Sequence, residues 1–230
     1  MSNDATITLD HTLGELVAEL PARARVLERH GLDYCCHGQR SLGDAAAAAD
    51  LDANALAAEL ASVLDTSGAE VDALGPAALV EHVLRTHHAY LHEELPALRA
   101  LADKVNSVHS CRHPELTEVA RLVHALADDL GPHLAKEEQV LFPAIMRQAT
   151  EAGSAGMPLA PPIRVMMAEH ATVGALLEAL RSTARGYEVP ADGCASYHGL
   201  YARLADLEAD TFRHVHLENN VLFPQVLKPA

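Results

Sequence analysis

The sequence predicts an all-α protein, in which a small N-terminal helical domain precedes an antiparallel four-helix bundle. Composition is the first reason. Hydrophobic residues make up 49% of the 230 residues and aromatic residues only 3%, and the chain has no Trp. Ala and Leu dominate the apolar residues, which favours helix over sheet. The second reason is periodicity, because apolar residues recur at steps of three and four through long segments that short, turn-rich connections join.

Residues 1–66 form the predicted small domain, with four short helices. The stretch TLGELVAELPARARVLERHG indicates two of them, and Gly31 stands where the second should end. Two further helices follow in Ala-rich stretches, and Asp52 is placed to cap the last one. Between the two pairs lies LDYCCHGQ, which contains Cys35 and Cys36.

A linker rich in small and acidic residues, 67–76, leads to the predicted bundle at 77–230. Pro76 follows a Gly and suits the first turn of a helix. Internal prolines predict kinks in three of the bundle helices. The four helices are expected at residues 77–107, 115–148, 162–186 and 194–227.

Charge and hydropathy exclude several classes of partner. With 17 Lys and Arg against 32 Asp and Glu, the formal charge is -15. Such an acidic surface repels phosphate backbones, so no nucleic-acid partner is expected. No apolar run reaches the roughly 18 residues of a membrane span, so no membrane partner is expected either. The polar N-terminus lacks the apolar core of a signal peptide, which predicts a cytoplasmic protein with reduced cysteines.

One sequence motif occurs twice in the predicted bundle. HLAKEEQVLFPAI begins at His133 and HVHLENNVLFPQV begins at His214, 81 positions later. Each has a His, a Glu four residues on, and then Val-Leu-Phe-Pro. The repeat extends further, because His88 precedes the first copy by 45 residues and His170 precedes the second by 44. Each half of the bundle therefore contributes one single His and one His-x-x-x-Glu pair, as expected for a duplicated helical hairpin.

The apolar stripe of each helix decides which polar residues face inward. In the second helix the stripe passes through His133 and Glu137 and continues to Val140. In the fourth helix it passes through His214 and Glu218. The stripes of the first and third helices each include one His. The six inward residues are therefore His88, His133, Glu137, His170, His214 and Glu218.

Three other histidines are neighbours of these positions. His216 lies about 200° round the helix from His214, at 100° per residue, so it should face away from the core. His87 should sit toward the flank of its helix, which leaves His88 as the inward residue. His92, one turn beyond His88, should be solvated.

Metal binding explains the six inward residues better than packing does. A single buried His is most often a hydrogen-bonded core residue, but burying an unpaired Glu costs several kcal/mol. Six ligands suit two metal ions, each held by two His, with Glu137 and Glu218 bridging them. Imidazole and carboxylate ligands without thiolate suit iron or manganese, with zinc left open, and unfilled coordination positions permit oxygen or nitric oxide to bind. The chain has no His-Glu-x-x-His, so nothing supports a zinc protease.

Five stretches together resemble a known family: DYCCHGQRSLGDA, HHAYLHEELPAL, PHLAKEEQVLFP, EHATVGALL and HVHLENNVLFP. In this order, and over nearly the whole chain, they resemble the repair of iron centres (RIC) family of YtfE/ScdA-like proteins. The resemblance implies a hemerythrin-like bundle with a non-haem di-iron centre, behind a small Cys-Cys domain. The chain departs from the family in one place, where His87-His88 replaces the common Tyr-His. By motif, the family's iron ligands fall on His88, His133, Glu137, His170, His214 and Glu218.

The resemblance implies that the protein repairs iron–sulfur clusters damaged by oxidative or nitrosative stress. Its partners would be damaged iron–sulfur proteins, with nitric oxide or oxygen as small ligands, and a homodimer is left open. Two other functions stay open: a hemerythrin-like sensor or carrier of oxygen or nitric oxide, and a di-iron oxidoreductase that reduces nitric oxide. A separate Cys-Cys domain favours repair or redox turnover, because a carrier does not need thiols. We expect a metal-binding repair protein rather than a dedicated enzyme.

Cys35 and Cys36 are expected to be accessible redox thiols, because adjacent cysteines form only a strained disulfide that reduces easily. The alternative is that they are two small residues that pack a turn. His109 and His113 follow the first bundle helix and are candidates to line access to the site. His109 is also a candidate for an additional ligand.

Overall fold

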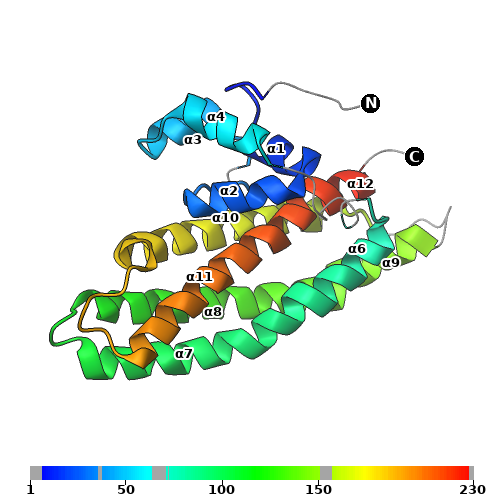
Figure 1. Ribbon diagram of the computed structural model, residues 1–230. Coiled ribbons are helices and arrows are strands. Elements are labelled where there is room, and N and C mark those ends of the chain that lie inside the picture. Colours follow the sequence, from blue (N-terminus) through cyan, green and yellow to red (C-terminus); the bar gives the residue numbers. More distant parts are fainter. Residues whose placement is uncertain (1–6, 36–37, 64–70, 72, 151–156, 228–230) are drawn as a thin grey trace.

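The computed structural model describes residues 7–35, 38–63, 71, 73–150 and 157–227. Within these residues the protein is all-α, as predicted, and strand-like pairing is limited to one isolated bridge between Thr12 and Ser41. Short helices of the N-terminal domain lie across long helices that run side by side (Figure 1). A membrane-spanning helix is not found in this part of the chain, since none combines the necessary length with enough apolar character.

Four short helices make up the N-terminal domain, and local side chains explain their ends. Thr12 and Glu15 form a capping box at the first helix, and Asp52 accepts hydrogen bonds from two backbone N–H groups at the last. Gly31 follows the second helix with a φ of 66°, a left-handed conformation that favours glycine. The helices are α1 (Leu13–Glu19), α2 (Ala24–Arg29), α3 (Leu42–Ala48) and α4 (Ala53–Ala61).

Four rods form the bundle, and three of them consist of two consecutive α-helices. The first rod begins at Pro76, whose missing N–H would have no helical partner in the first turn. The rods are α6 (Pro76–Val83) with α7 (Ala89–His109), α8 (Glu115–Lys136) with α9 (Phe142–Thr150), α10 (Ala160–Thr183), and α11 (Ala195–His216) with α12 (Phe223–Leu227). Helix α8 packs against α7 and α10, and α11 packs against α7, which gives the predicted bundle.

A π-helical turn joins the two α-helices in each of these three rods. The turns span Leu84–His88, Glu137–Leu141 and Leu217–Leu222. A π turn takes in one more residue than an α turn, so it rotates the residues that follow it relative to a regular helix. Two of the turns end just before Phe-Pro. Proline favours such a break, because it has no N–H and crowds the carbonyl four residues back.

The second π turn corrects the predicted stripe of its helix. On a regular helix Val140 would be in the core, but it is 50% exposed, whereas Leu141 is 1% exposed. The extra residue in the turn Glu137–Leu141 rotates the chain by about 100°, so the next residue takes the inward place. His133 and Glu137 come before that rotation is complete and keep their inward positions.

A layer of buried polar side chains divides the apolar core of the bundle. On one side, a large cluster includes Leu130 and Val173 and extends into the N-terminal domain. On the other side, a smaller cluster includes Leu141 and Met166. The six inward His and Glu residues are all buried and lie between these clusters along the rods. Because buried polar groups are unfavourable without partners, this layer marks a site.

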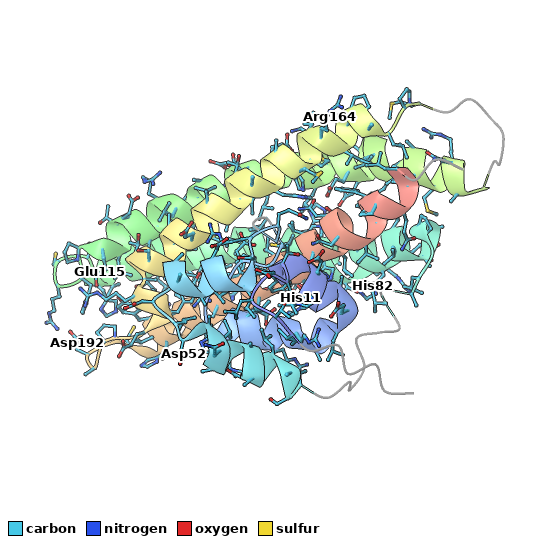
Figure 2. All side chains as sticks on the ribbon, turned by 90° about the horizontal axis from the view of Figure 1, so that it is seen from above. His11, Asp52, His82, Glu115, Arg164 and Asp192 are labelled. Carbon is cyan, nitrogen blue, oxygen red and sulfur yellow. The ribbon has the colours of Figure 1, made fainter. Side chains whose placement is uncertain are left out.

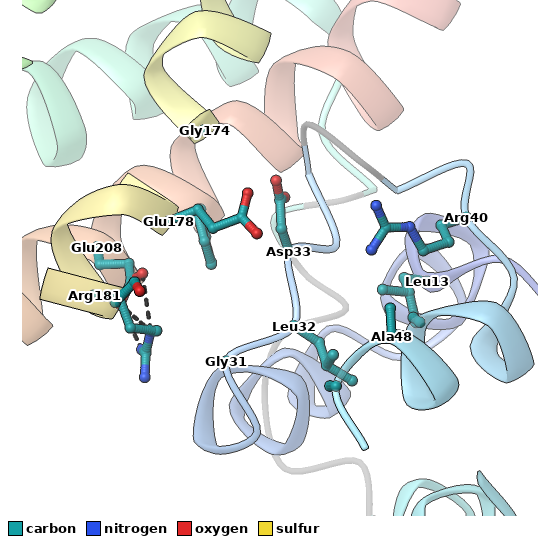
Figure 3. Close-up of a pocket in the computed structure, with 14 residues that line it drawn as sticks. Leu13, Gly31, Leu32, Asp33, Arg40, Ala48, Gly174, Glu178, Arg181 and Glu208 are labelled. Atoms are coloured by element: carbon teal, nitrogen blue, oxygen red, sulfur yellow. Dashed lines mark hydrogen bonds and ion pairs between the residues drawn. The ribbon is translucent and has the colours of Figure 1, made fainter. Parts of the chain in front are cut away.

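The N-terminal domain packs on α10 and α11, with a cavity of about 290 Å³ between them. In Figure 3, Asp33 and Glu178 point toward each other across this cavity. Glu208 is buried at its edge and accepts a hydrogen bond from Nε–H of Arg181 at 2.9 Å. The buried charge of Glu208 is therefore paired.

Candidate metal centre

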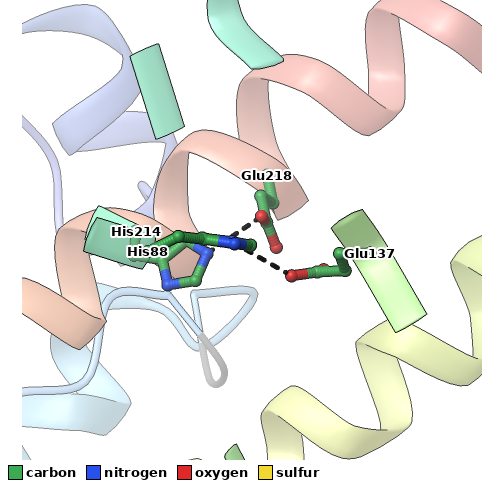
Figure 4. A group of neighbouring side chains, drawn as sticks. All are labelled: His88, Glu137, His214 and Glu218. Atoms are coloured by element: carbon green, nitrogen blue, oxygen red, sulfur yellow. Dashed lines mark hydrogen bonds and ion pairs between the residues drawn. The ribbon is translucent and has the colours of Figure 1, made fainter. Parts of the chain in front are cut away.

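All six inward residues meet in the polar layer, as two groups. The first group consists of His88, Glu137, His214 and Glu218. The second consists of His133, Glu137, His170 and Glu218. Within each group the ligand atoms all lie within 4.8 Å of one another. Figure 4 shows the first group, whose two carboxylates approach from different helices. Both glutamates belong to both groups, so the two groups share their carboxylates.

Glu218 faces one histidine of each group. Its Oε1 lies 3.0 Å from Nε2 of His214, and its Oε2 lies 3.1 Å from Nε2 of His170. A carboxylate has two oxygens that can each serve a different cation. The position of Glu218 therefore suits a bridge between two metal ions.

Glu137 has the equivalent place on the second helix. Its Oε2 lies 3.4 Å from Nε2 of His88 and 3.4 Å from Nε2 of His133. Among the described residues, neither oxygen of Glu137 nor Nε2 of His88 has a hydrogen-bond partner. Glu137 is fully buried (0% exposed), and an unpaired carboxylate there is unfavourable without a cation. The residues present therefore fit metal ions at their centre.

Burial also sets the charge of the ligands. It lowers the pKa of His88 and His133 below their ordinary values and that of His214 to about 4, so these rings are neutral at pH 7. Neutral imidazole is the form that binds metals. Burial raises the pKa of Glu137, and the carboxylate of Glu218 raises it further, because two buried carboxylates repel each other. A cation between them would relieve that repulsion.

Acceptors behind three of the histidines fix the orientation of the rings. The pairs, each measured from the His Nδ1, are His88–Glu138 (2.9 Å), His133–Glu169 (3.0 Å) and His170–Asn219 (2.9 Å). Such an acceptor keeps the proton on Nδ1 and directs the lone pair of Nε2 to the centre, as is usual for metal-binding histidines. Sequence reasoning missed these acceptors. The available signal was adjacency, since each stands next to a predicted ligand in the sequence.

The fourth histidine, His214, has a different neighbour. Its Nδ1 has no hydrogen-bond partner among the residues that the structure describes, and the ring of His87 stacks on it with centroids 5.5 Å apart. In the repeat, His87 takes the place of Glu169, because each directly precedes the single His of its half. His87 also corrects an expectation. It is buried (4% exposed) rather than at the helix flank, and its Nδ1 lies 2.9 Å from Oδ1 of Asp210.

His216 belongs to neither ligand group, as expected, but it is buried rather than exposed. It is 3% exposed and packs against Tyr34 of the N-terminal domain, with ring centroids 5.6 Å apart. Helical periodicity gives the direction of a side chain but not what packs there. His92 is 54% exposed at its side chain, as expected, and its Nε2 lies 2.7 Å from Oε1 of Glu138.

The expectation of an accessible thiol is wrong for Cys35, and Cys36 lies outside the described residues. Cys35 is 4% exposed, and its Sγ–H donates to Oδ1 of Asp33 at 3.1 Å. The domain interface buries Cys35, which its local sequence does not reveal. The carbonyl of Cys35 accepts a hydrogen bond from Nδ2 of Asn219 at 3.4 Å, and Oδ1 of Asn219 is the acceptor for His170. One side chain therefore connects the Cys35 backbone to the centre.

His109 and His113 do not line the site, which corrects a further expectation. His109 ends α7, about 30 Å along the helix from its start at 1.5 Å per residue. There its Nε2 lies 3.1 Å from Sγ of Cys194, and Nε2 of His113 lies 3.1 Å from Oδ1 of Asp192. Figure 2 shows Asp192 near one end of the bundle. His109 is therefore too far away to supply a further ligand.

Known proteins share both parts of this architecture. The hemerythrin HHE cation-binding domain matches residues 79–226, and the ScdA N-terminal domain, a domain of unknown function, matches residues 9–64. The iron-sulfur cluster repair protein YtfE of Enterobacter sp. (strain 638) is 36% identical over 222 residues, which cover 95% of this chain and 97% of that protein. Proteins of the same name from Citrobacter koseri and Escherichia coli O1:K1 are each 34% identical over 219 residues, with 95% and 97% covered. The chain therefore belongs to the repair of iron centres (RIC) family, in which an ScdA-type N-terminal domain precedes a hemerythrin-type bundle.

Proposed function

We propose that this is a di-iron protein that repairs iron–sulfur clusters damaged by oxidative or nitrosative stress. One observation carries the proposal: two buried ligand groups share Glu137 and Glu218, and both oxygens of Glu137 lack a hydrogen-bond partner in the described part of the chain. Relatives named as iron–sulfur cluster repair proteins align with nearly the whole chain, which supports the same activity here. The substrates would be damaged iron–sulfur proteins in the cytoplasm.

In this proposal the two ligand groups hold one iron ion each. The ligands are His88 and His214 for one ion, His133 and His170 for the other, and Glu137 and Glu218 for both. Imidazole and carboxylate donors without thiolate suit iron or manganese. Bound iron would supply redox chemistry and open coordination positions for nitric oxide or oxygen.

The chain's own residues determine how firmly iron is held. Acceptors on Nδ1 orient three of the four imidazoles, and burial of the six ligands keeps bulk water away. Hemerythrin-type oxygen carriers, as a family, use five histidines and two carboxylates, whereas this centre has one imidazole fewer. Fewer protein ligands leave more exchangeable positions. We therefore propose that iron is released to an acceptor, and faster from the reduced protein, because ferrous iron binds such sites more weakly than ferric iron.

The N-terminal domain favours repair over oxygen carriage. Asn219 donates to the carbonyl of Cys35 and accepts from His170, so one side chain connects the Cys35 backbone to the centre. A carrier or sensor has no use for thiols at this place, whereas iron donation can use them. The same contact also favours the second candidate, a di-iron oxidoreductase that reduces nitric oxide, because thiols can supply electrons.

Metal analysis followed by iron transfer tests the proposal. Protein loaded with iron under anaerobic conditions is mixed with an apo-cluster acceptor, once oxidised and once reduced, and acceptor activity is followed with time. We expect two iron ions per chain at the start and faster transfer from the reduced protein. Retention of both ions over hours in both states, with reversible oxygen binding, would support a carrier or sensor instead. Turnover of nitric oxide without loss of iron would support the oxidoreductase.

A further inference from the structure

A third pair of histidines lies beside the centre. The rings of His82 and His87 have centroids 5.9 Å apart and an angle of 74° between their planes. Within the first ligand group, His88 and His214 have centroids 5.0 Å apart and an angle of 65°. The histidine pair of the second group has 4.8 Å and 67°. The third pair is therefore T-shaped like the two ligand pairs, and its rings are slightly further apart.

His87 is oriented in the same way as the predicted ligands. Its Nδ1 lies 2.9 Å from Oδ1 of Asp210, just as Nδ1 of His88 lies 2.9 Å from Oε1 of Glu138. The carboxylate accepts a hydrogen bond from Nδ1–H, which leaves the lone pair on Nε2. His87 belongs to neither ligand group, so its Nε2 is not one of the atoms that would hold the two ions of the centre.

Both rings line a cavity of about 240 Å³ between the N-terminal domain and the bundle. The cavity walls are mostly apolar. The cation that lines it, Arg213, lies 3.4 Å from Oε1 of Glu28, which offsets its charge. His216 also lines the cavity, and its Nε2 has no hydrogen-bond partner within the described ranges. Its Nδ1 faces the amide of Asn220, so Nε2 carries the proton and can donate to a water molecule in the cavity.

His87 also connects this cavity to the centre. Its ring stacks on His214, with centroids 5.5 Å apart, and it also contacts the ring of His82, with centroids 5.9 Å apart. His82 is only partly buried and lines the cavity. A series of three imidazoles therefore leads from a predicted iron ligand to the domain interface.

We propose that His82 and His87 bind a third divalent metal ion, which is ferrous iron in the cell. Iron that leaves the centre would bind at this transit site first. An imidazole nitrogen lies about 2 Å from a bound transition metal, so two rings in this T-shaped arrangement can both reach one ion. Two protein ligands hold an ion less firmly than the four of each ligand group, which suits a transit site. The inference rests on the proposed function as an iron donor, but the site can be tested without it.

Cobalt titration tests the site itself. Metal-free full-length protein is titrated with Co²⁺ under anaerobic conditions and followed by visible absorption and equilibrium dialysis. We expect three equivalents in the wild type, the third bound most weakly, and two in His82→Gln. The control His198→Gln removes an exposed imidazole from α11 and should still bind three. Two equivalents in the wild type, or three in His82→Gln, would overturn the third site. Two tightly bound equivalents in His82→Gln also show that the variant has folded.

The rate of iron release tests whether the site acts as a transit site for iron. Each protein is loaded with iron at the centre, reduced, and mixed with a ferrous chelator. We expect severalfold slower release from His82→Gln than from the wild type and from His198→Gln, with equal iron content at the start. Equal release rates would refute the role of His82 and His87 as a transit site. If the wild type releases no iron at all, the proposed function as an iron donor fails, and the cobalt stoichiometry still decides the third site.

Discussion

Replacing Asn219 by alanine removes two contacts at the centre. Its Oδ1 lies 2.9 Å from Nδ1 of His170, and its Nδ2 donates to the carbonyl of Cys35 at 3.4 Å. The first contact helps to keep the proton of His170 on Nδ1 and the lone pair of Nε2 directed at the metal. Loss of such a partner costs about 10- to 100-fold in metal affinity. Since each factor of ten equals about 1.4 kcal/mol, the expected loss is about 1.4 to 2.8 kcal/mol.

Asn220→Ala is the matched control. Asn220 is the next residue and has the same side chain, but its Nδ2 lies 3.1 Å from Nδ1 of His216, which belongs to neither ligand group. Competition with a ferrous chelator measures the iron affinity of each variant, and thermal unfolding of the metal-free proteins checks the fold. We expect the loss of affinity in Asn219→Ala alone. Equal affinities in the two variants would refute the role of Asn219 in orienting His170.

His214→Ala should lose metal, whereas His216→Ala should keep both ions and lose only stability, because His216 packs on Tyr34 outside the ligand groups. Equal metal loss in the two variants would show that the assigned register is wrong. Cys35→Ser combined with Cys36→Ser should leave the iron content intact and impair cluster repair, and unchanged repair in an apo-cluster reactivation assay would favour a packing role. Burial lowers the pKa of His216 to about 4, so on acidification the unfolded chain takes up this proton before the folded chain does. The metal-free protein should therefore lose stability as the pH falls from about 6.5 toward 4, by about 3 kcal/mol from this residue. Denaturant unfolding across that range should show a smaller loss in His216→Gln, and identical pH dependence would contradict this.

The inward positions of His133 and Glu137 could be predicted because they depend on spacing within one helix. A His and a Glu four residues apart lie on the same face of a regular helix, whatever packs around them. The same reasoning fails at Val140, because the π turn changes the number of residues per turn. The proline of Val-Leu-Phe-Pro was the local signal for that turn, but it is also compatible with an ordinary kink.

Contacts between distant segments could not be predicted from periodicity. Cys35 and His216 are buried because the N-terminal domain packs on the bundle, and nothing in their own helices or turns indicates that cover. The pairing of His170 with Asn219 likewise depends on how two helices face each other. The repeat of a hairpin indicates which residues gather at the centre, but it does not indicate the second set of side chains that orients them.

The central claim is that two metal ions share Glu137 and Glu218. Mössbauer spectroscopy of the oxidised, iron-loaded protein tests it most directly, because ferric ions joined by bridging ligands are magnetically coupled and isolated ions are not. Iron analysis of the same sample gives the number of ions per chain. We predict two irons per chain in one coupled pair. A single iron per chain, or two irons without magnetic coupling, would contradict the shared centre.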